Sequence, residues 1–112
     1  MEDLHPIEKE GRFKNELKSR QVNYTRHFEE DRLPYRQNVT KDLIEQHLSN
    51  PKDLVEYKYE EDNHNREKYQ VLFDKSTKYY LKIVLSMTNG DLFIVTAHVI
   101  NKTKKKLSQI IG

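Results

Sequence analysis

The strongest constraint on the fold comes from residues 79–100, where Asn89-Gly90 separates two runs rich in β-branched and aromatic residues. Asn-Gly is the best short hairpin signal, because a type I′ turn needs positive φ at both central residues. The pattern therefore predicts paired antiparallel strands over Tyr79–Met87 and Leu92–Ile100. Both sides of this pair are apolar near the middle, which favours a central position in a sheet.

A two-residue loop would also fix the register of the hairpin, with Thr88 opposite Asp91. Strict alternation gives Leu85 opposite Ile94, Ile83 opposite Thr96 and Leu81 opposite His98 on one face, and Val84 opposite Val95 and Lys82 opposite Ala97 on the other. Polar groups then gather at the end away from the turn (Lys82, Thr96 and His98). We expect that a site could form there.

The rest of the chain has helical patterns first and strand patterns later. Residues 1–20 are expected to be helical in two pieces that meet at Gly11, and a short helix over Tyr24–Asp31 would end before Pro34. A second helix is predicted over Lys41–Ser49, with Thr40 as its N-cap. Two further strands are predicted at Leu54–Tyr59 and Arg66–Phe73.

These elements predict an α+β fold, with N-terminal helices on one face of a four-stranded antiparallel meander. The 112 residues suit one domain, in which residues 1–20 form a helical extension and residues 102–112 a basic tail. No apolar run reaches the roughly 18 residues of a membrane helix, and no secretory signal opens the chain. We therefore expect a cytoplasmic protein without a membrane partner.

Charge is unevenly distributed although its sum is only +2. No acidic residue follows Leu92, whereas Asp53–Asp62 is rich in acids. Two basic groups stand apart from that acidic stretch: Arg20, Arg26, Arg32 and Arg36, and then Lys102, Lys104, Lys105 and Lys106. Such blocks could form one basic face, although charged residues are most often simply solvated.

The candidate chemistry is that of histidine, lysine, arginine and hydroxyl groups, because the chain has no cysteine. A neutral imidazole at His27 can take a proton from a ribose 2′-hydroxyl, and nearby arginines can hold the phosphate. Taken alone, that stretch is more often an ion-paired helix face. The five histidines are scattered and only three glycines are present, so neither a metal site nor a phosphate-cradling loop is predicted.

The stretch from about Tyr24 to Lys106 resembles the barnase–EndoU–colicin–RelE-like (BECR) small nucleases, especially the branch found in phages, mobile elements and toxin modules. Four segments carry the resemblance: RHFEEDRLP, LIEQHLSNPKDLVEY, REKYQVLF and YYLKIVLSMTNGDLFIVTAHVI. It implies His27 as general acid or base, Arg32 as phosphate ligand, Lys82 or Lys68 as a second cation, and Thr96 as a hydrogen-bond donor. Because His98 follows Thr96-Ala97, His98 is the alternative working imidazole.

The resemblance implies a metal-independent ribonuclease, without a cofactor, that leaves a 2′,3′-cyclic phosphate. RNA is the expected partner, and a toxin would also have an antitoxin protein. Further RNA-binding candidates are Arg26, Arg36, Lys68, Tyr80, Lys102 and Lys104. The alternative is a non-catalytic module that binds RNA or a protein, with bases stacked on exposed Tyr24, Tyr35, Tyr57 and Tyr59.

Overall fold

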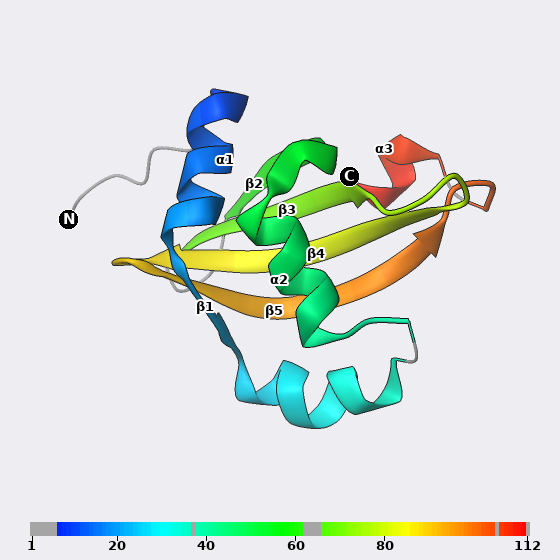
Figure 1. Cartoon of the computed structure of the whole chain (residues 1–112), viewed down its shortest axis with the longest axis horizontal. Helices are drawn as coiled ribbons and strands as arrows, with labels where there is room; N and C mark the ends of the chain where they lie inside the picture. Colours follow the sequence, from blue (N-terminus) through cyan, green and yellow to red (C-terminus); the bar gives the residue numbers. More distant parts are fainter. Residues whose placement is uncertain (1–6, 37, 62–65, 105, 112) are drawn as a thin grey trace.

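A mixed five-stranded sheet organises the protein, and helices lie on both of its faces (Figure 1). The structure is a computed structural model that describes residues 7–36, 38–61, 66–104 and 106–111. In chain order the elements are α1 (Glu10–Ser19), β1 (Gln21–Tyr24), η1 (Phe28–Arg32), η2 (Leu33–Tyr35), α2 (Lys41–Ser49), η3 (Pro51–Asp53), β2 (Leu54–Glu61), β3 (Glu67–Asp74), β4 (Tyr79–Thr88), β5 (Asp91–Asn101) and α3 (Leu107–Ile110). The predicted α+β class is confirmed.

The strand order is β1-β5-β4-β3-β2. Strands β2 to β5 form the predicted antiparallel meander, and each begins and ends within two residues of its predicted bounds. The prediction of four strands was nevertheless incomplete, because β1 adds a fifth strand, parallel to β5. This strand has only four residues, two of them polar amides, and its partner lies about 70 residues further along the chain. Local sequence patterns carry no signal for such a pairing.

Helix α2 has its predicted bounds and cap, since the Thr40 hydroxyl accepts a hydrogen bond from Leu43 N at 3.1 Å. Two other helical predictions need correction. Gly11 lies inside the first turn of α1 and does not divide it; residues 1–6 lie outside the described residues. Helical backbone begins at Arg26, two residues later than in the predicted helix over 24–31, because Tyr24 belongs to β1, and the helical turns of η1 and η2 continue through Pro34.

The main core lies between the sheet and the pair α1 and α2, which cross one face of the strands in Figure 1. The ring of Phe13 on α1 stacks on Tyr57 with 3.8 Å between centroids, and its edge meets Tyr69. Tyr24, Tyr57 and Tyr59 all pack against this core. The expectation that they are exposed base-stacking residues was therefore wrong, and of the four only Tyr35 is mostly exposed, at 80%.

A smaller apolar cluster covers part of the opposite face. Ile110 and Ile111 pack there against Leu72 and Ile100, with Tyr80 beside them. The C-terminal segment is thus more than the predicted basic tail, because α3 closes one end of this second face. Helices consequently occupy both faces, and the prediction of helices on one face holds only for α1 and α2.

A β-bulge at Val95 changes the register of the central hairpin. Near the turn the predicted pairs are confirmed, with Thr88 opposite Asp91 and Leu85 opposite Ile94. Beyond them the register shifts by one residue, so the expected pairs further from the turn are wrong. The observed pairs are Val84 with Thr96, Ile83 with Ala97, Lys82 with His98 and Leu81 with Val99.

The bulge keeps polar side chains of β5 out of the core, where strict alternation would bury them. The predicted register would aim Thr96 and His98 into the core opposite Ile83 and Leu81, where each unpaired polar group costs about 1–3 kcal/mol. One extra residue shifts the alternation, so that Ala97 and Val99 face the core instead. Thr96 and His98 therefore share the second face of the sheet with Lys82.

The described residues contain no helix long and apolar enough to cross a membrane.

The buried tyrosines predict a loss of stability at alkaline pH. Burial raises the pKa of Tyr24 and of Tyr69 well above the ordinary 10.0, and the carboxylates of Glu45 and Glu67 respectively reinforce the shift. The folded chain keeps both phenols protonated where the unfolded chain releases their protons. The free energy of unfolding is therefore expected to hold below pH 10 and to fall as the pH rises further.

Urea titrations from neutral pH to pH 11 would measure this loss. Tyr69→Phe should weaken the alkaline dependence, while lowering stability at neutral pH by about 1–2 kcal/mol because Tyr69 bonds both Ile7 N and Glu67. Tyr35→Phe, at the exposed position, is the matched control and should leave the pH dependence of the free energy of unfolding unchanged. The prediction is contradicted if, above pH 10, the free energy of unfolding falls as steeply with pH in Tyr69→Phe as in the unsubstituted protein.

Candidate functional site

An open cavity of about 410 Å³ lies beside the outer edge of β5. Strand β1 pairs with β5 only as far as Ile94, and the chain then turns away into η1 and η2. Figure 1 shows this turning segment alongside β5, below the sheet in that view. The cavity between them is lined by His27, Arg32, Arg36, Val95, Thr96 and His98.

Two local features bring these side chains together. The bulge turns Thr96 and His98 away from the core, as described above. On the other wall, Phe28 is fully buried and anchors η1, and its backbone N–H donates to the Thr25 hydroxyl at 3.3 Å. With Phe28 inside, the neighbouring His27 and Arg32 are left exposed.

His27 is held in a defined orientation by two neighbours. Its Nδ1 lies 2.9 Å from Asp31 Oδ2, and Arg32 Nε lies 3.4 Å from its Nε2. A proton on Nδ1 satisfies the carboxylate and leaves a lone pair on Nε2, which accepts the hydrogen bond from Arg32 Nε. The side chains of His27 and Asp31 are 64% and 62% exposed, so this pair adds little to stability. Its effect is to select the tautomer whose Nε2 can accept a proton.

Arg36 connects the cavity to a second hollow of about 140 Å³, lined by Arg36, Asn38, Val39, His98 and Val99. The Arg36 side chain is half-buried, and its Nε has no hydrogen-bond partner within the described part of the chain. A buried guanidinium N–H without a partner is costly, and an anionic oxygen would satisfy it. Among the described residues, two arginines and no carboxylate line the main cavity, which suits a phosphate.

The structure brings five of the predicted site residues to this cavity and leaves the others outside it. The five are His27, Arg32, Arg36, Thr96 and His98. Arg26 points to solvent and pairs with Glu30, while Lys68 lies opposite Ser86 on the second face of the sheet. At the far end of β5, Lys102 pairs with Asp74 and lies over the Tyr80 ring, and Lys104 is exposed.

Lys82 is next to His98 in the register but does not line the cavity. Its Nζ donates a hydrogen bond to the Ile110 carbonyl at 2.7 Å. That carbonyl ends α3, and a cation at a helix C-terminus is favourable. The observed contact of Lys82 is therefore with the C-terminal segment.

Sequence reasoning missed Asp31, Asn38 and Val95 as parts of this region. Asp31 follows His27 by four residues, a spacing that places two side chains on one face of a helical turn and could have identified the pair. Asn38 and Val95 had no comparable signal, because their positions depend on the path after η2 and on the bulge.

Among the described residues, no group of three or more metal-ligating side chains lies close enough to hold a metal ion.

Comparison with known proteins gave no match: no family model, no curated protein and no solved structure is similar to this chain at a significant level.

The Lys82 contact predicts that Lys82→Met will loosen the C-terminal segment. Loss of a part-buried bond from a charged donor should lower the local opening free energy of α3 by about 1–2 kcal/mol. Amide hydrogen exchange at Ile111, whose N–H bonds Leu107 O, should then speed up by roughly ten-fold. Lys68→Met, on the same face but at the other end, is the control. Unchanged exchange at Ile111 would show that the contact contributes nothing.

Proposed function

We propose that the protein is a metal-independent endoribonuclease whose active site is the cavity beside β5. One observation carries the proposal: two imidazoles, two guanidiniums and a hydroxyl line the same open cavity. Cleavage of RNA by its own 2′-hydroxyl needs a base, an acid and positive charge around the phosphate. The cavity offers each of these groups from this chain's own side chains.

His27 is assigned as the general base. Asp31 holds its Nδ1, so Nε2 is the atom that takes the proton from the 2′-hydroxyl once Arg32 Nε, which donates to it in this structure, turns to the phosphate. The 2′-oxygen then attacks the adjacent phosphorus. A 2′,3′-cyclic phosphate forms as the bond from phosphorus to the 5′-oxygen of the next nucleotide breaks.

His98 is assigned as the general acid that gives its proton to the leaving 5′-oxygen, which departs as a 5′-hydroxyl. It faces the same cavity from β5, opposite the η1 wall. Each turnover leaves His27 protonated and His98 neutral, and proton exchange with water restores both. The opposite roles of the two imidazoles require one of them neutral and the other protonated at the start.

Arg32 and Arg36 are assigned to the non-bridging oxygens, on which negative charge increases in the transition state. Guanidinium groups suit this role because their planar N–H donors match phosphate geometry. Thr96 adds a hydroxyl donor from β5. This assignment gives the cationic role to the two arginines, in place of Lys82 or Lys68.

The resemblance to BECR nucleases supports the same reading, because it singled out His27, Arg32, Thr96 and His98 from sequence motifs. With that family's phage and toxin-module branch as the guide, the proposal extends to a toxin that slows growth of its host and is held in check by an antitoxin protein. Expression of the protein alone, compared with a His27→Ala variant, addresses this extension.

The proposal predicts cleavage of single-stranded RNA in the presence of EDTA, with 2′,3′-cyclic phosphate and 5′-hydroxyl ends. His27→Ala and His98→Ala should each slow cleavage by roughly 10²–10⁴-fold. The rate of the unsubstituted enzyme should be bell-shaped in pH. Residual activity should lose its acidic limb in His27→Ala, which lacks the base, and its alkaline limb in His98→Ala, which lacks the acid.

His47→Ala is the matched control, because His47 bonds the Leu43 carbonyl and packs on Phe73 away from the cavity. It should retain full activity. Full cleavage by both His27→Ala and His98→Ala would rule out the assigned roles. RNA that is bound with strong salt dependence yet recovered intact would instead identify a non-catalytic RNA-binding module.

A further inference from the structure

Two loops far apart in the sequence meet at the end of the sheet where β5 finishes. One joins β3 to β4 and the other follows β5, and the N–H of Lys102 bonds the Lys78 carbonyl at 2.9 Å. Four of their lysines form what we call the lysine end: Lys75, Lys78, Lys102 and Lys104.

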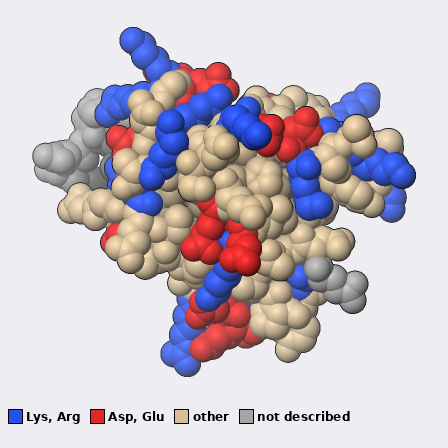
Figure 2. Space-filling view, in the orientation of Figure 1, with Lys and Arg blue, Asp and Glu red and all other residues tan. Residues whose placement is uncertain are grey.

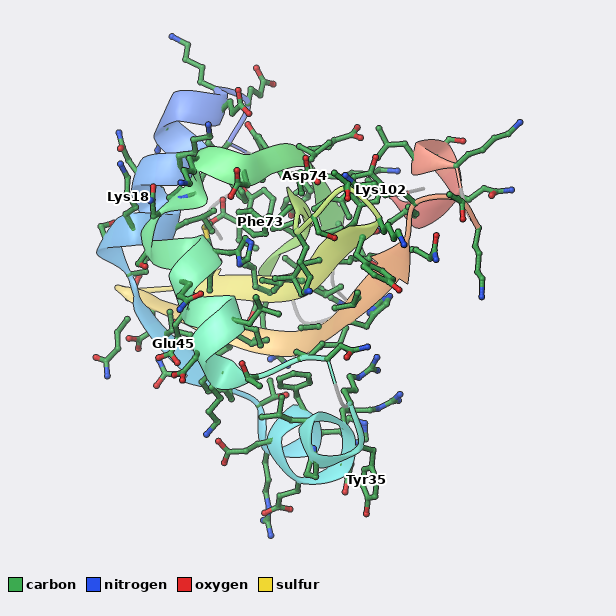
Figure 3. The ribbon with its side chains drawn as sticks, turned by 45° about the vertical axis from the view of Figure 1, so that its right-hand side comes forward. Lys18, Tyr35, Glu45, Phe73, Asp74 and Lys102 are labelled. Carbon is green, nitrogen blue, oxygen red and sulfur yellow. The ribbon has the colours of Figure 1, made fainter. Side chains whose placement is uncertain are left out.

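The lysine end carries little compensating negative charge. Segments 74–82 and 92–112 together contain seven lysines and one acid, Asp74. Asp74 is paired with Lys102, and Figure 3 shows the two labelled residues side by side. Lys78 and Lys104 are exposed. In Figure 2 blue side chains project from the right-hand end of the molecule, where these loops lie in Figure 1.

The cavity continues towards this end along β5. The main hollow is lined by Val95, Thr96 and His98, and the second hollow by His98 and Val99. The two share Arg36 as well, so they follow one another along the outer edge of the strand. From His98 to Lys102 the strand advances about 13 Å at its usual rise per residue. The two hollows and the lysine end therefore follow one another in space along the outer edge of β5.

We infer that single-stranded RNA lies along this edge, with the cleaved phosphate in the cavity and the neighbouring backbone held at the lysine end. The inference rests on the proposed function, to which it adds an extended substrate. An RNA strand suits this surface because its phosphates recur along the chain, and each one bound by a lysine releases counterions. A compact anion could fill the cavity but could not reach the lysines as well.

Binding of a single-stranded oligonucleotide of about 12 nucleotides with every 2′-oxygen methylated tests the surface without cleavage, because the attacking hydroxyl is blocked. Fluorescence anisotropy at several salt concentrations gives the slope of log affinity against log salt. Lys78→Gln with Lys104→Gln removes two phosphate contacts and should make this slope shallower by about 1.4. Both residues are exposed in loops, so folding should be unaffected.

Lys9→Gln with Lys18→Gln is the matched control. It removes the same charge from exposed positions on and beside α1, and Figure 3 shows Lys18 at the far side of the molecule from Lys102. The control should keep the original slope. The inference would be overturned if the unsubstituted protein and both double variants had the same salt slope. It would also be overturned if the two double variants reduced the salt slope by the same amount. Such a result would indicate that the lysine end faces another partner, such as an acidic protein.

Cleavage assays separate this inference from the proposed active site. A dinucleotide fills only the cavity, so Lys78→Gln with Lys104→Gln should cleave it as fast as the unsubstituted enzyme. The unsubstituted enzyme should have a higher kcat/KM on the longer RNA than on the dinucleotide, and the same variant should lose this difference. If no RNA is cleaved at all, the proposed function fails, while the salt slope with the methylated strand still decides whether the lysine end binds RNA.

Discussion

The extra residue in β5 is the constraint on which the candidate site depends. Without the bulge at Val95, the alternation of the hairpin would send Thr96 and His98 into the apolar core. With it, the core receives Ala97 and Val99, and the polar pair turns outward to the cavity. One local irregularity thus satisfies the packing of the core and supplies one wall of the site. Bulges often re-aim side chains in this way.

Much of the fold could be predicted from sequence because its signals are local. Asn89-Gly90 fixed the turn of the hairpin, and Thr40 marked the start of α2. The bulge had a weaker signal: the apolar positions shift phase between Ile94 and Ala97, and the strict register would have buried two polar side chains. Strand β1 could not be found in this way, since its stability comes from a partner distant in sequence.

The site was harder to predict than the fold, because its two walls come from segments about 60 residues apart. Sequence motifs drew attention to His27, Arg32, Thr96 and His98, and these side chains do line one cavity. Lys82, which the sequence also singled out on a central strand, bonds the end of α3 and does not line the cavity. A strand lysine can be satisfied by a carbonyl of a segment that sequence patterns do not show to be folded.

The parallel pairing of β1 with β5 also has a consequence for the order of folding. The β4–β5 hairpin can form from neighbours in sequence, whereas β1 must wait for a strand that follows about 70 residues later. During synthesis the segment carrying His27 and Arg32 therefore emerges long before the segment that carries His98. In a chain that folds in this order, His27 and His98 would come together in one cavity only when β1 pairs with β5. In a partly made chain the two walls of this cavity would not yet meet.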